Sequence, residues 1–268
     1  MLLAIDVGNT ATVIGVFLGD QLVDSWRIAT EARRTADELG VLITALVDRA
    51  ETDRLNRTGA DRSETVTGVT VCSTVPSVLL EVRGMCRRYF PDVPALVVEP
   101  GVRTGVPVLT DNPKEVGTDR IVNALAAAHL FGGPLIVVDF GTATTFDAIS
   151  ARGEYLGGAI APGIDVSVEA LGARGAQLRR VELVRPRSVI GKNTVEALQA
   201  GIVFGFAGQV DGVVERMAAE LDGEVTVVAT GGQAPLVLEE VGRIDAHEPD
   251  LTLIGLRLIF DRNSTERG

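Results

Sequence analysis

Two turns in the sequence have the residue types that bind phosphate groups. IDVGNT (5–10) and VDFGTAT (138–144) each place an aspartate at the end of an apolar run, followed by a glycine and small polar side chains. Glycine lets the backbone turn tightly, so several N–H groups can face a phosphate while the aspartate holds a metal ion through water. One such turn is also typical of a plain hairpin. Its recurrence favours a nucleotide site.

A third glycine turn, Thr230-Gly231-Gly232, follows another apolar run. Glycine has no Cβ, so a flat adenine or ribose can approach the backbone closely at such a turn. Taken singly, the motif is equally typical of a turn that uses glycine only for packing. The three turns together indicate an ATP cleft between two duplicated domains.

The chemistry of the phosphate acceptor is expected in NPKEVGTDR (112–120), which leads into an apolar helix. Asp119 and Arg120 stand at the start of that helix, where the helix dipole favours anions. Arg120 can grip a carboxylate with two hydrogen bonds, and Asp119 can accept a hydroxyl proton as the oxygen attacks a γ-phosphate. The alternative is equally good on these residues alone: Asp119 caps the helix and Arg120 points to solvent.

Composition excludes several other classes of protein. The chain of 268 residues has a formal net charge of −11 and only two lysines, Lys114 and Lys192, so general affinity for nucleic acid or an anionic membrane is not expected. Two cysteines and two histidines provide neither a disulfide framework nor a metal cluster, and they suit a reducing cytosol. The P-loop, GxGxxG and GxSxG motifs are absent. Positive charge at a phosphate must therefore come from metal ions, arginine and backbone N–H groups.

The elements that position these motifs follow from hydrophobic periodicity and turn residues. Residues 2–28 predict three antiparallel strands, and Thr35 with Glu38 predicts a capping box for a helix over about 35–50. The polar segment 49–68 predicts a surface loop, and the uncharged segment 121–138 predicts a buried helix, a turn and a strand rather than a membrane span. Further helices are expected at about 118–131, 193–221, after Pro235, and at 254–262.

The strand–turn–strand pattern of the N-terminus recurs from residue 134 onward, with Asp139 in the place of Asp6. An internal repeat at this spacing predicts an α/β protein of two similar domains, residues 1–112 and 113–268.

Six motifs resemble those of the type III pantothenate kinases and occur in the same order: DVGNT, NPKEVGTDRIVNA, VVDFGTATTFD, GGAIAPG, GKNTVEALQAG and TGG. The likeness covers nearly the whole chain. It implies the fold of the actin/Hsp70/sugar-kinase superfamily, with two duplicated ribonuclease-H-like domains and an ATP cleft between them. It also implies ATP-dependent phosphorylation of pantothenate at the 4′-hydroxyl, the first step of coenzyme A synthesis. The resemblance further implies a cytoplasmic homodimer that requires Mg²⁺ and a monovalent cation, K⁺ or NH₄⁺.

The resemblance also assigns roles to matching positions. Asp6 would hold Mg²⁺ with ATP, Asp119 would be the catalytic base, and Asp139 would ligate the monovalent cation. The implied ATP-binding residues are Asp6, Val7, Gly8, Asn9, Thr10, Ala11, Thr12, Val13 and Thr142. The implied pantothenate-binding residues are Gly117, Thr118, Asp119, Arg120 and Thr194.

The chain departs from the family pattern at a few positions. Many members carry a substrate-contacting tyrosine where this chain has Thr110, and a lysine or similar polar residue late in the first loop, where it has Ala11 and Val13. Two other functions stay open: a non-catalytic, kinase-like regulator, and a kinase for another small alcohol.

The helix expected over 193–221 carries small residues at helical spacing: Ala197, Gly201, Gly205 and Gly208. This stripe suits close packing against the helix's own sheet or, alternatively, against its twin in a dimer. Cys72 and Cys86 have no activating partner nearby in the sequence and are expected to be inert thiols.

Overall fold

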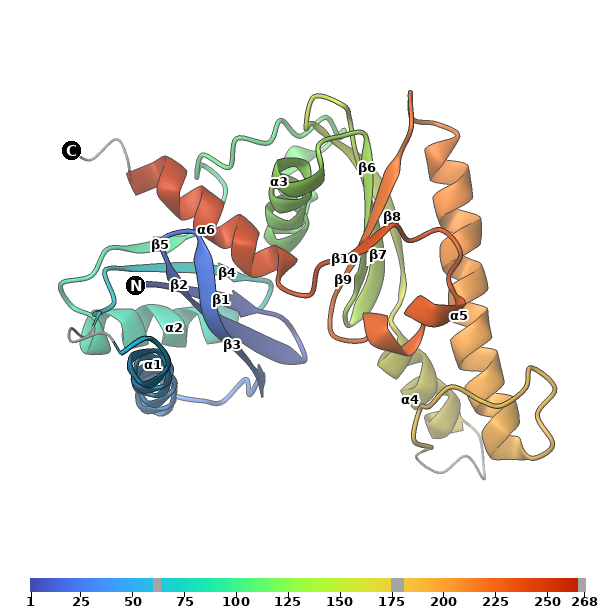
Figure 1. The fold of residues 1–268 in the computed structure, drawn as a ribbon, viewed down its shortest axis with the longest axis horizontal. Coiled ribbons are helices and arrows are strands. Elements are labelled where there is room, and N and C mark those ends of the chain that lie inside the picture. Colours follow the sequence, from blue (N-terminus) through green and yellow to red (C-terminus); the bar gives the residue numbers. More distant parts are fainter. Residues whose placement is uncertain (60–63, 175–180, 265–268) are drawn as a thin grey trace. The chain divides into compact units, whose positions relative to one another are not determined.

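Each part of the chain folds around a five-stranded sheet of its own (Figure 1). The computed structural model describes residues 1–59, 64–174 and 181–264. Unit 1 comprises Met1–Gly105, Lys114–Asn123 and the segment from Thr252 onward, whereas unit 2 comprises Val106–Pro113 and Ala124–Leu251. The domain boundary after residue 112, which was inferred from the two sequence repeats, stays a prediction.

The sheet of unit 1 contains the predicted meander. Its strand order is β3-β2-β1-β4-β5, and β1 pairs antiparallel with β2 and parallel with β4. The strands are β1 (Leu2–Val7), β2 (Ala11–Leu18), β3 (Gln21–Ala29), β4 (Gly68–Ser73) and β5 (Ala95–Val97).

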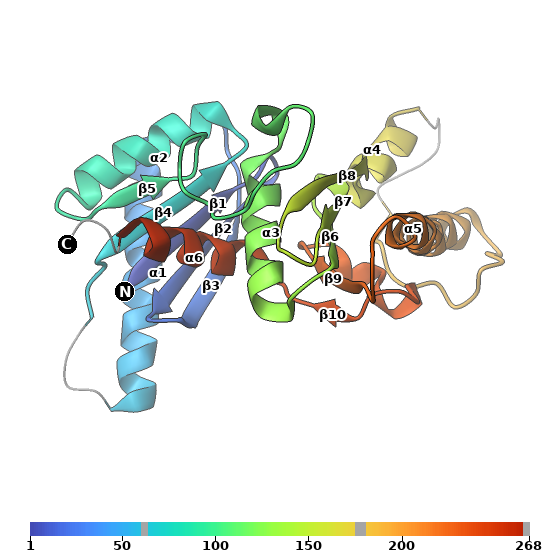
Figure 2. The ribbon, with the colours of Figure 1, turned by 90° about the horizontal axis from the view of Figure 1, so that it is seen from above.

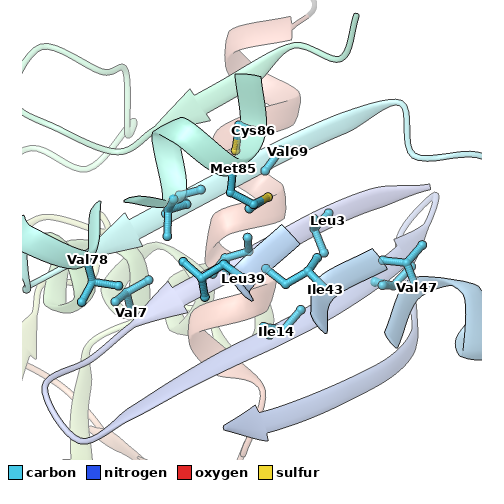
Figure 3. Close-up of a cluster of buried hydrophobic side chains, with 14 of the residues drawn as sticks. Leu3, Val7, Ile14, Leu39, Ile43, Val47, Val69, Val78, Met85 and Cys86 are labelled. Carbon is cyan, nitrogen blue, oxygen red and sulfur yellow. The ribbon is translucent and has the colours of Figure 1, made fainter. Parts of the chain in front are cut away.

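Helices α1 (Ala36–Thr58) and α2 (Pro76–Tyr89) cover one face of this sheet. Side chains alternate between the two faces of a strand, so Leu3, Ile5 and Val7 of β1 all point to this face and are fully buried. They pack against apolar side chains of both helices (Figure 3). The predicted capping box is present, with the Glu38 N–H donating to Thr35 Oγ1 at 3.3 Å and the Thr35 N–H to Glu38 Oε2 at 2.8 Å.

Helix α1 continues to Thr58, so the prediction of a loop from residue 49 was wrong for this stretch. The polar residues there satisfy one another: Arg54 Nε lies 2.7 Å from Glu51 Oε2, and both side chains are largely buried. A paired charge can be buried at a helix–sheet boundary where an unpaired charge cannot. Gly59 then ends the helix in the left-handed conformation at φ 64°. Residues 60–63 of the predicted loop lie outside the described residues.

Helix α6 (Leu251–Ser264), predicted at 254–262, covers the opposite face of the first sheet (Figure 2). It lies close because the sheet carries glycine beneath it: a Cβ at Gly15 would lie 2.7 Å from Leu253 Cδ1, and one at Gly68 would lie 2.3 Å from Phe260 Cζ. The same helix fixes the first turns of α3 (Thr118–Phe131), since Thr252 Oγ1 donates to Asn123 Oδ1 at 2.7 Å. The division between the units falls within α3, after Asn123.

The sheet of unit 2 repeats the topology of the first. Its order is β10-β9-β6-β7-β8, with β6 antiparallel to β7 and parallel to β9, as β1 is to β2 and β4. The strands are β6 (Leu135–Phe140), β7 (Ala143–Ile149), β8 (Tyr155–Pro162), β9 (Thr226–Thr230) and β10 (Ala246–His247). The structure therefore agrees with two duplicated ribonuclease-H-like units.

Helices α4 (Ile164–Arg174) and α5 (Thr194–Ala218) belong to unit 2. Phe206 and Val210 of α5 pack into the apolar cluster of this sheet. By length and composition alone, α5 is the one described helix that would qualify as a membrane span, and 44% of the relevant window is buried. A core helix of a soluble protein has the same properties.

The helix predicted after Pro235 is absent and was a wrong expectation. The segment forms two single 3₁₀ turns, Ala234–Leu236 and Leu238–Glu240, each closed by hydrogen bonds between residues three apart. Seven residues are too few for a stable α-helix without a long apolar stripe.

Candidate functional site

The turn between β1 and β2 is tight, and only its tip is accessible. The Gly8 N–H donates to Ala11 O at 3.0 Å, whereas Asn9 and Thr10 are exposed. Val7 is buried in the core, and the buried Thr12 hydroxyl is 2.8 Å from that of Thr30. A phosphate at this turn can therefore meet Asn9, Thr10 and backbone groups, but not the side chains of Val7 and Thr12.

Asp6 lies in a row of side chains that crosses the first sheet. It is directly opposite Val13 on β2 and Cys72 on β4, and Val13 is opposite Arg27 on β3. Residues paired in this way project to the same face of a sheet. The Cys72 thiol donates to Asp6 Oδ1 at 3.1 Å. A buried thiol and a partly buried carboxylate thus meet at the end of β1.

The pKa of Asp6 is raised from 3.8 to about 6. Burial is the main cause, because it removes water from the charged form, and the negative charge of Asp119 adds to it. The hydrogen bond from Cys72 and the charge of Arg27 act in the opposite direction. A bound cation would stabilise the ionised form of Asp6, which burial disfavours.

Asp119 lies in the first turn of α3, where the Arg120 N–H donates to Asp119 Oδ1 at 2.9 Å. Burial raises the pKa of Asp119, while this hydrogen bond and the Arg120 charge oppose the rise. Asp119 and Asp6 both belong to unit 1, and the charge of Asp119 reaches Asp6. Two carboxylates predicted from distant motifs therefore influence one another directly.

Gly117 precedes α3 and makes room for the Asp119 carboxylate. A Cβ at Gly117 would lie 2.5 Å from Asp119 Oδ1, closer than real Cβ atoms come. The glycine of the VGTDR segment therefore permits the observed rotamer of the aspartate.

The second turn, in unit 2, is shorter by one residue. The Gly141 N–H donates to Ala143 O at 3.0 Å, and Thr142 is exposed at the tip. Asp139, the second-to-last residue of β6, lies opposite Thr230 of β9. A Cβ at Gly231 would lie 2.4 Å from Asp139 Oδ1, and Gly231 has φ +91°. The glycine turn after β9 thus packs against the end of β6. This contact agrees with the interpretation that Thr230-Gly231-Gly232 uses glycine for close packing.

Thr194 is the exposed first residue of α5, after Asn193, whose Oδ1 accepts the Glu196 N–H at 2.9 Å. It belongs to unit 2, whereas Gly117, Thr118, Asp119 and Arg120 belong to unit 1. Thr194 lines an open depression of about 440 Å³ together with Leu171, Ala197 and Gly201.

A divalent metal at the first turn suits the residues present. Within the described residues, no three His, Cys, Asp or Glu side chains converge on a metal-sized site. Mg²⁺ does not need such a cage, because it commonly binds through one or two carboxylates, waters and the phosphates of a nucleotide. Asp6, with a charge destabilised by burial, fits that role.

Sequence reasoning missed two polar contacts. Burial raises the pKa of Cys72 well above its usual value, so the thiol is unreactive as expected, but it is also a hydrogen-bond donor to Asp6. In unit 2 the buried Tyr155 hydroxyl donates to the buried Asp147 at 2.7 Å. The first contact depends on the register of β1 with β4, which no local pattern reveals.

Comparisons with known proteins agree with the motifs. A family model described as type III pantothenate kinase matches residues 2–216. A Streptomyces avermitilis protein named type III pantothenate kinase is 66% identical over 98% of both chains. A protein of that name from Acidothermus cellulolyticus is 63% identical over 99% of this chain and 100% of its own. The structure also resembles the ADPNP-bound activator of 2-hydroxyisocaproyl-CoA dehydratase from Clostridium difficile, with a TM-score of 0.54 over 99% of this chain and 97% of the other. At 15% identity, this last likeness shows the fold alone.

Proposed function

The chain belongs to the type III pantothenate kinase family, and from this premise we infer that it transfers the γ-phosphoryl group of ATP to pantothenate. The product is 4′-phosphopantothenate, made in the first step of coenzyme A biosynthesis. The protein is an enzyme, and it uses ATP with a divalent metal. The observation that carries this assignment is the 66% identity across the chain, with Asp6 and Asp119 both present and in electrostatic contact. No observation favours the non-catalytic regulator.

Asp119 is the proposed catalytic base. Its Oδ1 accepts the Arg120 N–H, so Oδ2 is the oxygen proposed to receive the proton of the 4′-hydroxyl. Burial raises its pKa, which makes the carboxylate a stronger base than an exposed aspartate. Gly117, Thr118 and Arg120 are the proposed pantothenate contacts beside it, with the Arg120 guanidinium holding the pantothenate carboxylate. Thr194, at the start of α5, is a further proposed pantothenate contact.

Asp6 is proposed to orient the nucleotide through a water molecule, and bound Mg²⁺ would neutralise charge on the β- and γ-phosphates. Gly8, Asn9 and Thr10 are accessible at the first turn and support phosphate contacts there. Ala11 and Val13 are partly buried, and Val7 and Thr12 are buried, so these four would contribute only through the backbone. Thr142, exposed at the second turn, is the proposed second phosphate contact.

Two finer points of the assignment are also proposals. A homodimer is supported by the exposed small-residue stripe of α5, since nothing lies within 4 Å of a Cβ built at Gly201, Gly205 or Gly208. The three glycines do not pack against their own sheet, and their exposure supports the dimer interpretation. A cytoplasmic location is supported by the two buried free cysteines.

A monovalent-cation site at Asp139 is likewise proposed, and it predicts the effect of Asp139→Ala. Removing the carboxylate should raise the K⁺ concentration for half-maximal activity by about tenfold or more, because a lost ionic ligand costs on the order of 1–3 kcal/mol. A K⁺ titration of the initial rate in Tris-chloride measures this. Equal activity of the wild-type enzyme in sodium and potassium buffers would contradict a cation site.

Gly117→Ala provides a test of how Asp119 is positioned. The added methyl group should push the carboxylate out of its rotamer and lower kcat by about tenfold or more, because small misplacement of a reacting group is costly. The melting temperature should change little, since only the end of a short side chain must move. Unchanged kcat in a folded variant would show that the observed rotamer is not the active one. Gly242→Ala, at an exposed position where an added Cβ meets nothing closer than 3.7 Å, is a control for general effects of glycine replacement on turnover.

The assigned function is tested by ADP release coupled to a spectroscopic assay, with pantothenate and a panel of small sugars as acceptors. ADP release is expected with pantothenate and Mg²⁺, and not with the sugars. Release with a sugar but not with pantothenate would assign the chain to another alcohol kinase of the same fold.

A further inference from the structure

We propose that Cys72 is a positioning residue, whose thiol holds the Asp6 carboxylate in the orientation that metal-bound ATP requires. The inference rests on the proposed role of Asp6 and adds a second residue to the site that binds ATP with Mg²⁺.

The geometry makes this contact a fixed feature of the sheet. Asp6 and Cys72 are direct partners in the parallel pairing of β1 with β4. The register is unbroken from the pair of Leu2 with Gly68 to the pair of Val7 with Ser73. The Cβ atoms of the two residues therefore cannot separate without shifting the two strands. Cys72 is fully buried, and its Sγ lies 3.1 Å from Asp6 Oδ1, which is short for a hydrogen bond from sulfur.

The contact gives the two carboxylate oxygens of Asp6 different roles. Oδ1 is occupied by the thiol, so Oδ2 is left for a metal-bound water. Without a donor at position 72, the Asp6 carboxylate would rotate among several staggered conformers. Each binding of ATP would then have to fix one conformer, at a cost in conformational entropy.

A thiol also suits a carboxylate that must remain available to a cation. The S–H group is a weak donor. A stronger cationic donor in its place would neutralise Asp6 and compete with the metal for it. Arg27 is the cation in the same cross-sheet row, but Val13 lies between Arg27 and Asp6. The charge of Arg27 therefore affects the pKa of Asp6 less than burial, the Cys72 hydrogen bond or the charge of Asp119 does.

Three substitutions separate the donor from the volume of the side chain. Cys72→Ser keeps a donor, whereas Cys72→Ala and Cys72→Val remove it, and valine fills the space of the thiol with an apolar side chain that a strand accepts. Cys86→Ala is the matched control, because Cys86 is the other buried cysteine of unit 1 and packs in the core away from Asp6. Thermal unfolding of each variant reports on the fold separately.

The measured quantity is the dissociation constant of ATP, obtained by calorimetry once with Mg²⁺ and once with EDTA. Loss of the donor in Cys72→Ala and Cys72→Val should raise this constant about threefold to tenfold with Mg²⁺, as expected for one hydrogen bond from a weak donor, and leave the EDTA value nearly unchanged. Cys72→Ser should restore the value with Mg²⁺ to within about twofold of wild type. Cys86→Ala should match wild type in both media.

Several results would overturn the proposal. Wild-type affinity in both Cys72→Ala and Cys72→Val would show that the thiol orients nothing. Equal weakening with Mg²⁺ and EDTA, or a serine variant as weak as alanine, would assign Cys72 to packing alone. A wild-type protein that binds no ATP would instead contradict the proposed function, so the two failures are distinguishable.

Discussion

Asp119→Asn is expected to lower kcat by about 10²–10⁴-fold, the usual contribution of a general base. Asparagine has nearly the same shape, and its Oδ1 can still accept the Arg120 N–H that Asp119 accepts at 2.9 Å. The side chain loses its negative charge and, with it, the ability to take a proton. The dissociation constants of ATP and pantothenate should therefore stay within about threefold of wild type.

Steady-state kinetics and calorimetry on the same preparation test this expectation. Asp92→Asn, at an exposed position of unit 1, is the control and should have wild-type kinetics. Because burial raises the pKa of Asp119, the acidic limb of the wild-type kcat/KM profile should lie above the ordinary pKa of 3.8, with activity lost as pH falls through it. A near-native kcat in Asp119→Asn would remove this residue from the role of base.

Asp6→Asn is expected to have the second large effect, with opposite consequences for activity and for stability. Loss of the carboxylate should lower kcat/KM for Mg²⁺-ATP by about 10²-fold or more, since a charged group that orients the metal is removed. The folded protein should at the same time become more stable at pH 7.5 in EDTA. Burial makes the ionised form of Asp6 costly, and asparagine carries no charge.

The sign of the stability change follows from the two pKa values of Asp6. The folded-state pKa of about 6 exceeds the value of 3.8 expected for the unfolded chain, so the folded protein loses stability as pH rises from about 4 to about 6. This difference corresponds to at most about 3 kcal/mol, and the partial exposure of the side chain reduces it, so a gain of about 1 kcal/mol is expected.

Urea unfolding of wild type and Asp6→Asn at pH 4 and pH 7.5 measures the gain. The two proteins should be equally stable at pH 4 and differ at pH 7.5. A variant that is less stable at pH 7.5 would show that the Asp6 charge stabilises the fold, contrary to its burial.

The two hairpin turns were predictable because their signals are local. An aspartate, a glycine and small polar residues follow an apolar run in both, and the strands on either side pair with each other directly. The capping box at Thr35 and Glu38 is equally local, and the structure contains it.

Features that depend on contacts between distant segments were not predictable from the sequence. Helix α1 continues past residue 49, where Glu51 is buried and accepts the N–H of Glu64, 13 residues further along the chain, at 2.6 Å. Read individually, the polar residues of this stretch are typical of a loop. The contact of Cys72 with Asp6 requires β4 to lie beside β1 in one register, 66 residues apart in the chain. Hydrophobic periodicity carries no information on such pairings.

The most direct measurement is detection of the phosphorylated product itself. Wild-type protein and Asp119→Asn are incubated with ATP, Mg²⁺, K⁺ and pantothenate, and the mixture is analysed by mass spectrometry and ³¹P NMR. Wild type is predicted to form 4′-phosphopantothenate in a one-to-one ratio with ADP, and Asp119→Asn to form almost none while still binding both substrates. ADP formation without phosphorylated pantothenate, or equal product from both proteins, would contradict the assignment.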